Sequence, residues 1–284
     1  MRRSAALALV ALAGLATQAG AQFDPKRVAP HQEELRFTTP SPLSSLAAQA
    51  ERLGVEAAPE DAPDLARTAF RVYRPRRFKE GKAYGLFVWA SPSQYGILPT
   101  DWEKVFDGLD LIAIGPDGIG EGQPLAKRVG LCLDAAHNAL RRYTIDPERV
   151  YVGGFSDGAR VASLLAVNYP ELFRGGLYLG GMHWYRDVPV LGEDRRMWRG
   201  ELPTPNDERL TLVRERTRHA FVCGEKDPVL PQVEAVYRLA SASGFKHLLW
   251  LPIRGMAHNT PKRKYMTQAF EFLDAGAPEP PPGK

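Results

Sequence analysis

The stretch VYVGGFSDGARVASLLAVNYP, residues 150–170, joins two different patterns. Residues 150–152 end an apolar run that is typical of a buried strand. The residues after Ser156 follow helical spacing as far as the closing proline, which cannot continue a helix. The chain must therefore turn from strand to helix within two or three residues. Gly154 and Gly158 carry no side chains, so strand and helix can pack closely on either side of Ser156.

Ser156 lies at the centre of a G-x-S-x-G pattern, which between a strand and a helix is typical of a nucleophile elbow. We expect Ser156 to adopt a strained backbone conformation that points its hydroxyl out over the sheet. The amide of the next residue, Asp157, would then face a developing oxyanion, and the helix start adds a partial positive charge. The alternative is a serine that only caps the helix, because serine is a preferred N-cap residue.

The rest of the chain alternates between predicted strands and helices. Strands are expected at 84–90, 109–117, 176–181, 219–224 and 247–253, and helices at 124–143, 158–170, 231–243 and 264–276. The strands are nearly continuous apolar runs, which indicates that both faces of the sheet are covered. This alternation predicts an α/β fold with a mostly parallel, doubly wound sheet and helices on both faces. Ligands in such folds bind at the carboxyl ends of the strands.

A serine hydroxyl needs a base to become a nucleophile at neutral pH. In a sheet with this elbow the chain order is serine, acid and then histidine, so the base is expected after the last strand. His258 lies there, in the loop GMAHNTP that follows strand 247–253. His183 is its rival at the same end of the sheet, but as a base it would break the chain order. We therefore assign His258 as the candidate base and place His183 in the pocket or core.

A carboxylate beside the histidine would fix the tautomer and stabilise the imidazolium. Asp227 follows strand 219–224 in the segment GEKDPVLP and is the candidate acid. Asp187 competes with it because it also follows a strand, and Glu225 lies closer to the strand end. The alternative role for Asp227 is to cap a helix that begins at Pro228, since proline suits a first helical position.

Together these segments resemble the α/β-hydrolase superfamily, and within it the secreted esterases grouped with polyhydroxybutyrate depolymerases and feruloyl esterases. IDPERVYVGGFSDGARVASLLAVNYPELFRGG is similar to that group's strand, elbow and helix, GEKDPVLP to its acid turn and GMAHNTP to its histidine loop. The similarity covers residues 84–273. It implies the α/β-hydrolase fold and a serine carboxylic-ester hydrolase, with Ser156, Asp227 and His258 as nucleophile, acid and base.

One segment departs from the pattern of that group. Such enzymes usually carry a His-Gly pair after the strand that corresponds to 84–90, and the next backbone amides complete the oxyanion hole. This chain has Ala90 and Ser91 there, followed by Pro92, which has no amide hydrogen to donate. Ser91 is the candidate second oxyanion donor, with Ser93 as the alternative. The departure leaves open a second function class, a non-catalytic exported binding protein that retains the hydrolase fold.

A long irregular segment, residues 183–205, interrupts the alternation near the expected site. Its aromatic side chains Trp184, Tyr185 and Trp198 suit an apolar or aromatic acyl group or a polymer surface. Trp184 and Tyr185 are therefore candidate substrate-binding residues, and the expected substrate is a small-molecule or polymeric ester. The alternative is that these side chains anchor the segment to the core.

Residues 1–21 combine two arginines, an apolar run and small residues at the end, which is the pattern of a secretory signal peptide. The apolar run is too short for a membrane span. We expect residues 22–275 to form the α/β-hydrolase domain and the Pro-rich tail 276–284 to be disordered. The protein is thus expected to be exported, either to the periplasm or to the medium.

The net charge of +4 includes Arg2 and Arg3, and so small an excess does not predict a nucleic-acid partner. The local basic run RPRRFK, residues 74–79, is interpreted as a solvated turn. Cys132 and Cys223 lie in apolar surroundings and are expected to be buried free thiols. The spacing of cysteine and histidine predicts no metal site, and the proposed chemistry needs no cofactor. The sequence indicates no membrane partner and leaves the oligomeric state open.

Overall fold

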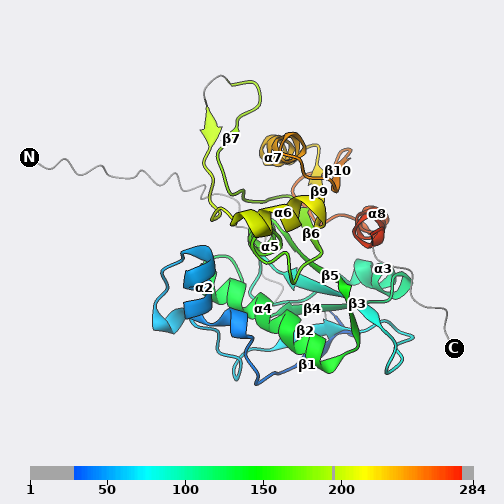
Figure 1. The fold of residues 1–284 in the computed structure, drawn as a ribbon. Helices are drawn as coiled ribbons and strands as arrows, with labels where there is room; N and C mark the ends of the chain where they lie inside the picture. The colour runs from blue at the N-terminus through cyan, green and yellow to red at the C-terminus, as the bar shows by residue number, and fades with distance from the viewer. Residues whose placement is uncertain (1–28, 194–195, 277–284) are drawn as a thin grey trace, which may run out of the picture.

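The computed structural model describes residues 29–193 and 196–276. The predicted signal peptide, residues 1–21, lies outside the described residues, and so does the predicted tail apart from Gly276. The described chain forms an eight-stranded sheet with helices on both faces and a separate two-stranded hairpin (Figure 1). This is the mostly parallel, doubly wound sheet that the alternation of strands and helices predicts.

The strands of the sheet lie in the order β1-β2-β4-β3-β5-β6-β9-β10. β1 pairs with β2 and β2 with β4 in antiparallel fashion, whereas the remaining six strands are parallel. Their bounds are β1 Glu33–Leu35, β2 Phe70–Tyr73, β3 Tyr84–Ala90, β4 Leu111–Pro116, β5 Ile145–Phe155, β6 Gly175–Leu179, β9 Arg218–Gly224 and β10 Leu248–Ile253. Because parallel strands end at the same edge, the loops after β3, β5, β6, β9 and β10 meet there.

The helices cover the sheet unequally (Figure 1). α2, α4, α5, α6 and α7 contribute to the cluster on one face, and α3 and α8 to the cluster on the other. Their bounds are α2 Leu46–Leu53, α3 Glu103–Gly108, α4 Leu125–Arg142, α5 Asp157–Asn168, α6 Asp207–Glu215, α7 Leu230–Ala242 and α8 Arg263–Asp274. Within the described ranges no helix has the length and apolar character that crossing a membrane requires.

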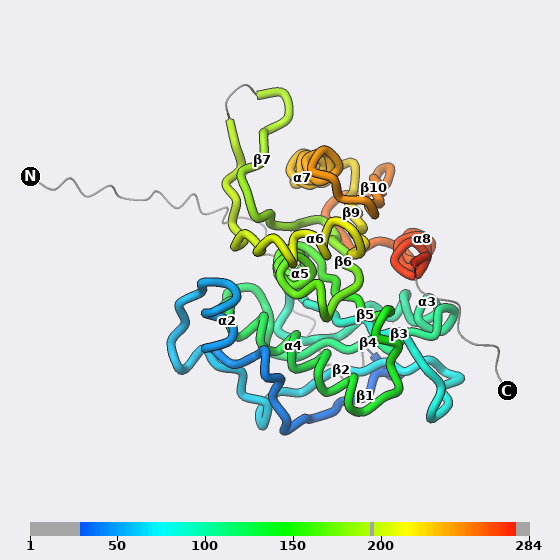
Figure 2. Tube along the Cα trace, in the orientation of Figure 1, coloured from blue at the N-terminus to red at the C-terminus, as the bar shows by residue number. Residues whose placement is uncertain are grey.

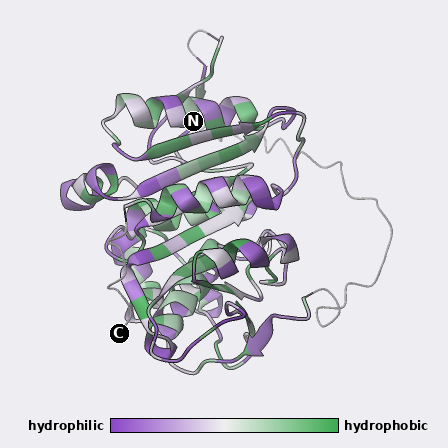
Figure 3. Ribbon diagram, turned by 90° about the vertical axis from the view of Figure 1, so that its right-hand side faces the viewer, coloured by the Kyte–Doolittle hydropathy of each residue, from purple (hydrophilic) through white to green (hydrophobic). Residues whose placement is uncertain are grey.

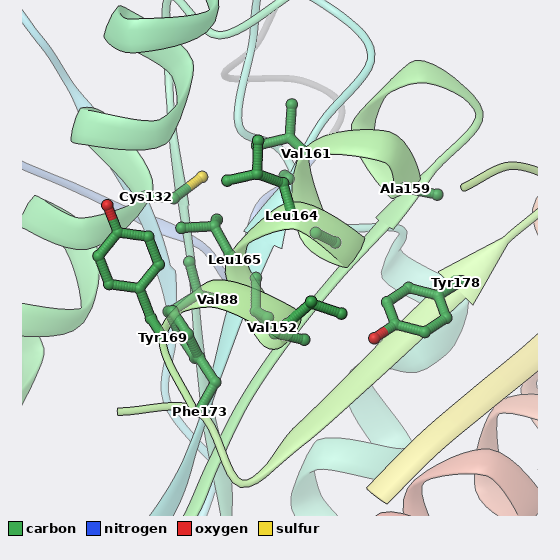
Figure 4. Close-up of a cluster of buried hydrophobic side chains, with 14 of the residues drawn as sticks. Val88, Cys132, Val152, Ala159, Val161, Leu164, Leu165, Tyr169, Phe173 and Tyr178 are labelled. Carbon is green, nitrogen blue, oxygen red and sulfur yellow. The ribbon is translucent and has the colours of Figure 1, made fainter. Parts of the chain in front are cut away.

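Side chains along β3 alternate between the two faces of the sheet, as the period of a strand requires. Val88 packs in the cluster beneath α4 and α5, whereas Phe87 packs in the cluster beneath α3 and α8. Figure 4 shows Val88 and Val152 of the sheet close to Leu164 and Leu165 of α5. The strands are mainly hydrophobic, while the helices mix hydrophobic and hydrophilic residues (Figure 3). Burial of such an aliphatic side chain stabilises the fold by ~1.5–3 kcal/mol, which fixes the strands that carry the site.

The segment 183–205, predicted to be irregular, contains a short antiparallel hairpin. β7 (Val188–Pro189) pairs with β8 (Met197–Trp198), and the hairpin projects beyond α6 and α7 (Figure 2). Asp187 joins the two ends of this hairpin, because Asp187 Oδ1 accepts a hydrogen bond from the Gly200 amide at 2.8 Å. Strands of two residues are too short to show the alternation by which a strand is predicted from sequence.

Candidate active site

The turn from β5 to α5 holds Ser156 in an unusual backbone conformation. Its φ is 54° and its ψ is −120°, and among the described non-glycine residues only Asp110 also has a positive φ. Ser156 donates its amide hydrogen to the Leu179 carbonyl at 2.8 Å and accepts one from the Ala159 amide at 3.0 Å. A conformation of this kind costs ~1–3 kcal/mol, which the surrounding structure must supply. It is the geometry expected of a nucleophile elbow.

Glycines make the elbow possible because three backbone segments meet there. A Cβ atom added to Gly158 would lie 2.0 Å from the Ala90 carbonyl oxygen, and one added to Gly154 would lie 2.3 Å from the Gly158 carbonyl. A Cβ atom on Gly181 would lie 2.6 Å from the Ser156 carbonyl oxygen. The end of β3, the start of α5 and the turn after β6 therefore approach at distances that only glycine permits.

Three side chains from three loops meet at the carboxyl edge of the sheet. His258 Nε2 lies 2.9 Å from Ser156 Oγ, and His258 Nδ1 lies 2.8 Å from Asp227 Oδ2. Ser156 follows β5, Asp227 follows β9 and His258 follows β10. The Asp227 side chain is 1% exposed and that of His258 38%, so the carboxylate is shielded while the imidazole reaches solvent. This arrangement is able to take a proton from the serine hydroxyl.

Asp227 is fixed from two sides. Its Oδ1 accepts the amide hydrogen of Val229 at 3.1 Å, and its own amide donates to the Gly224 carbonyl at 3.0 Å. The free oxygen, Oδ2, is the one that contacts His258. α7 begins at Leu230, with Val229 as its N-cap and no side-chain cap, so Asp227 closes the turn before the helix and does not cap it. The turn and the imidazole use different oxygens of the one carboxylate.

The rival residues make other contacts. Asp187 Oδ2 pairs with Arg199 at 3.1 Å at the base of the β7–β8 hairpin. Glu225 is exposed. His183 Nδ1 lies 2.7 Å from Glu201 Oε2, and its backbone amide donates to Ser163. None of these contacts involves Ser156 or His258.

The candidate oxyanion donor Asp157 is the first residue of α5, so its amide hydrogen has no acceptor within the helix. Its carboxylate turns away to Arg128 on α4, where Arg128 Nη1 lies 2.5 Å from Asp157 Oδ2. The Arg128 side chain is 8% exposed, and its Nε donates to the Ile119 carbonyl at 2.8 Å. No local pattern in the sequence marks Arg128, because its partner is far along the chain and one arginine in an amphipathic helix gives no signal.

The second candidate donor, Ser91, is buried directly after β3. Ser93 donates its amide hydrogen to Ser91 Oγ at 3.1 Å, and its hydroxyl donates to the Tyr95 carbonyl at 2.9 Å. Both donors of Ser93 are thus engaged within the loop. This leaves the backbone amide of Ser91 as the better placed of the two candidates.

Trp184 and Tyr185, the candidate substrate-binding residues, are only 2% and 6% exposed. The Trp184 ring packs against Tyr185 at 4.9 Å between centroids and against Phe245 at 5.3 Å. Side chains buried in this way have no surface to offer a substrate. The placement fits the alternative interpretation, in which they anchor the segment to the core.

Both cysteines are free and buried, as expected. Cys132 lies in the cluster beneath α5 (Figure 4). Cys223 is at the end of β9, close to Asp227. Burial, together with the Asp227 carboxylate, raises the pKa of the Cys223 thiol to about 12. The thiol therefore stays protonated at neutral pH and is a poor nucleophile.

The sheet order and the serine-bearing turn after β5 define the class of protein: the chain has the α/β-hydrolase fold. It resembles in structure a feruloyl esterase module from Clostridium thermocellum complexed with sinapinate, with 14% identity and a TM-score of 0.56 over 76% of this chain and 87% of that one. A thermophilic carboxylesterase from a metagenomic library, 15% identical, gives a TM-score of 0.52 over 74% and 84% of the two chains. At these identities the likeness concerns the fold alone.

Two relatives are similar in sequence. An acetylxylan esterase from Coprinopsis cinerea is 29% identical over 87 residues, which is 31% of this chain and 21% of the relative. Poly(3-hydroxyalkanoate) depolymerase C from Paucimonas lemoignei is 36% identical over 66 residues, or 23% and 15% of the two chains. The chain thus matches only about a fifth of these relatives or less. No family model matches the chain. The predicted resemblance to the esterases grouped with polyhydroxybutyrate depolymerases and feruloyl esterases is confirmed.

Proposed function

We propose that this chain is an exported hydrolase that cleaves carboxylic esters with Ser156 as its nucleophile. The observation that carries the proposal is the pair of hydrogen bonds, 2.9 and 2.8 Å long, that join Ser156 to His258 and His258 to Asp227. Both distances are within the range that proton transfer needs. The relatives named as an acetylxylan esterase and a poly(3-hydroxyalkanoate) depolymerase also support an ester substrate.

In the proposed reaction Ser156 Oγ attacks the ester carbonyl while His258 Nε2 accepts the hydroxyl proton. Asp227 accepts a hydrogen bond from the N–H group at Nδ1 of His258. The proton therefore stays on Nδ1, Nε2 is unprotonated before the attack, and the imidazolium is stabilised after it. The imidazolium then gives its proton to the leaving alcohol, and the acyl group remains on Ser156. The same imidazole then deprotonates a water molecule, which attacks the acyl carbon, and it returns the proton to Ser156 Oγ as the bond from Oγ to the acyl carbon breaks and the acid leaves. These steps require no cofactor.

We assign the stabilisation of the negative charge that develops on the carbonyl oxygen to hydrogen bonds from the backbone amides of Asp157 and Ser91. The Asp157 amide has no acceptor within α5, and the Ala90–Ser91 backbone lies against the start of the same helix at Gly158. Two amides on adjoining segments can converge on one oxygen. Each such donor contributes ~2.7–4 kcal/mol to transition-state stabilisation in a shielded site.

The substrate class we propose is a small-molecule or polymeric carboxylic ester. The first 21 residues support export, because they follow the order of charged start, apolar run and small residues that signal peptidase recognises.

The test is hydrolysis of p-nitrophenyl acetate and butyrate by the purified chain and by Ser156→Ala. We expect turnover by the parent protein and a loss of at least about 10³-fold in the variant, because the nucleophile is removed. A parent protein that is folded but hydrolyses neither ester, nor feruloyl or polyester substrates, would favour the non-catalytic binding protein instead.

A further inference from the structure

A basic hollow lies at the edge of the sheet opposite to Ser156. Its volume is about 740 Å³, and it is lined by Pro75, Arg76, Arg77, Lys79, Lys82, Lys104, Asp107, Gly108 and Asp110. These residues come from the loop between β2 and β3, from α3 and from the turn between α3 and β4, so they lie toward the amino ends of β3 and β4. The seven residues of β3 separate this edge from the catalytic edge by about 20 Å.

The positive charges of this hollow are only partly neutralised. Lys82 pairs with Asp110 at 2.6 Å, and Arg76 lies 3.7 Å from Asp107. The other three cations, Arg77, Lys79 and Lys104, are exposed and have no acidic partner within the described ranges. Three cations without an acidic partner therefore line one hollow together with two that are paired, which gives the hollow a positive potential.

The backbone that presents these cations is fixed. Phe78 stacks on Tyr84 at 5.0 Å between ring centroids, and the Lys79 amide donates to the Tyr84 hydroxyl at 2.7 Å. The Phe78 amide donates to the Pro75 carbonyl at 2.8 Å, which closes a turn. The backbone of the loop is therefore ordered before an anion binds, and only the side chains of its cations have to be ordered on binding.

The lining also indicates the kind of anion. None of the nine lining residues is aromatic, so the hollow offers no platform on which nucleic-acid bases would stack. None has a large apolar side chain that would enter a lipid bilayer. Its concave shape and volume suit compact charged units such as sugar rings that carry carboxylates.

We propose that this hollow binds an acidic polysaccharide through its carboxylate groups, and that the catalytic edge stays accessible while the chain is bound. The basic run 74–79, interpreted from the sequence as a solvated turn, would then be part of a binding site. Binding at the hollow does not depend on the esterase chemistry proposed for Ser156.

The test measures the affinity of the full chain for polygalacturonate, with dextran as the uncharged control, at several NaCl concentrations. The variant Arg77→Gln/Lys79→Gln/Lys104→Gln removes the three unpaired cations without breaking an ion pair. We expect parent binding that weakens with salt, and at least about a tenfold loss in the variant at low salt, where charges are least screened.

A matched variant, Arg254→Gln/Lys262→Gln/Lys264→Gln, removes the same charge from the catalytic edge and is expected to keep the parent affinity. Circular dichroism checks that both variants fold. Ester hydrolysis by the hollow variant should equal that of the parent, since the sites are far apart. Binding without any hydrolysis would refute the esterase proposal and leave this one intact.

The proposal is overturned if the parent binds polygalacturonate no better than dextran, or if the matched variant loses as much affinity as the hollow variant. It is also overturned if double-stranded DNA or anionic phosphatidylglycerol vesicles bind at the hollow and polygalacturonate does not.

Discussion

Gly158→Ala tests the idea that the end of β3 and the start of α5 form one oxyanion site. The added Cβ atom would lie 2.0 Å from the Ala90 carbonyl oxygen and 3.1 Å from the Ser91 carbonyl carbon. Cβ atoms essentially never approach a backbone oxygen within 3.0 Å, so the two segments must separate by about 1 Å. Ala90 pairs with Gly154 in the ladder between β3 and β5, so the strain falls on the end of that ladder.

A displacement of this size moves the Ser91 amide away from the Asp157 amide. A misplacement of about 1 Å costs on the order of 10²-fold in rate, and loss of one oxyanion donor costs about 10²–10³-fold. We therefore expect kcat for p-nitrophenyl butyrate to fall about 10²–10³-fold, with KM changed much less. The hydrogen bonds among Ser156, His258 and Asp227 do not involve the new methyl group.

The matched control is Gly108→Ala at the end of α3, where an added Cβ atom would meet nothing within 4 Å. Steady-state kinetics give kcat and KM for both variants, and thermal unfolding shows that both are folded. The control should keep the parent kcat within about twofold, as surface substitutions away from a site usually do. A folded Gly158→Ala protein with the parent kcat would refute the reasoning, because the amides could then not depend on this contact.

Three further predictions follow from contacts of the described residues. Asp227→Asn is expected to lower kcat about 10⁴-fold because the amide favours the wrong imidazole tautomer. Asp187→Asn should leave kcat nearly unchanged. A larger loss of kcat in Asp187→Asn than in Asp227→Asn would identify Asp187 as the acid. Arg128→Gln removes the nearer of the two cations beside the Asp157 carboxylate, leaving Arg160 at 4.0 Å, and should lower the free energy of unfolding in urea by about 1–3 kcal/mol; an unchanged unfolding midpoint would show that the pair is not stabilising. Burial lowers the pKa of His219 to about 4. The unfolded chain binds a proton at this imidazole below pH about 6.5 and the folded chain does not, so stability should fall by about 3 kcal/mol between pH 6.5 and 4. In His219→Gln this part of the pH dependence should be missing, and an identical pH profile would contradict the assignment.

The fold follows from patterns that are local in the sequence. Most of the parallel strands contain a short apolar run and the longer helices have an apolar face, so their alternation predicts the doubly wound sheet. The turn at Ser156 is also a local feature, because Gly154 and Gly158 flank it at fixed spacing. The chain order then selects His258 and Asp227 from a few candidates at strand ends. The structure brings these side chains into contact, while their catalytic roles stay predictions.

Other features depend on residues that are distant in the sequence. Trp184 is buried against Phe245, and the Asp157 carboxylate pairs with Arg128. Neither contact can be predicted from the residues that surround Trp184 or Asp157 in the sequence. The choice between Ser91 and Ser93 depends on hydrogen bonds within one loop. The basic hollow forms because α3 adds Lys104 to the run 74–79, which in the sequence looks like a solvated turn.

The most direct test of Ser156 as the nucleophile is to treat the folded chain with a fluorophosphonate and locate the adduct by mass spectrometry. We expect one covalent adduct, on Ser156, which is absent from Ser156→Ala and forms much more slowly in His258→Ala because the base is missing. A folded parent protein that takes up no reagent, or takes it up at another residue, would contradict the account.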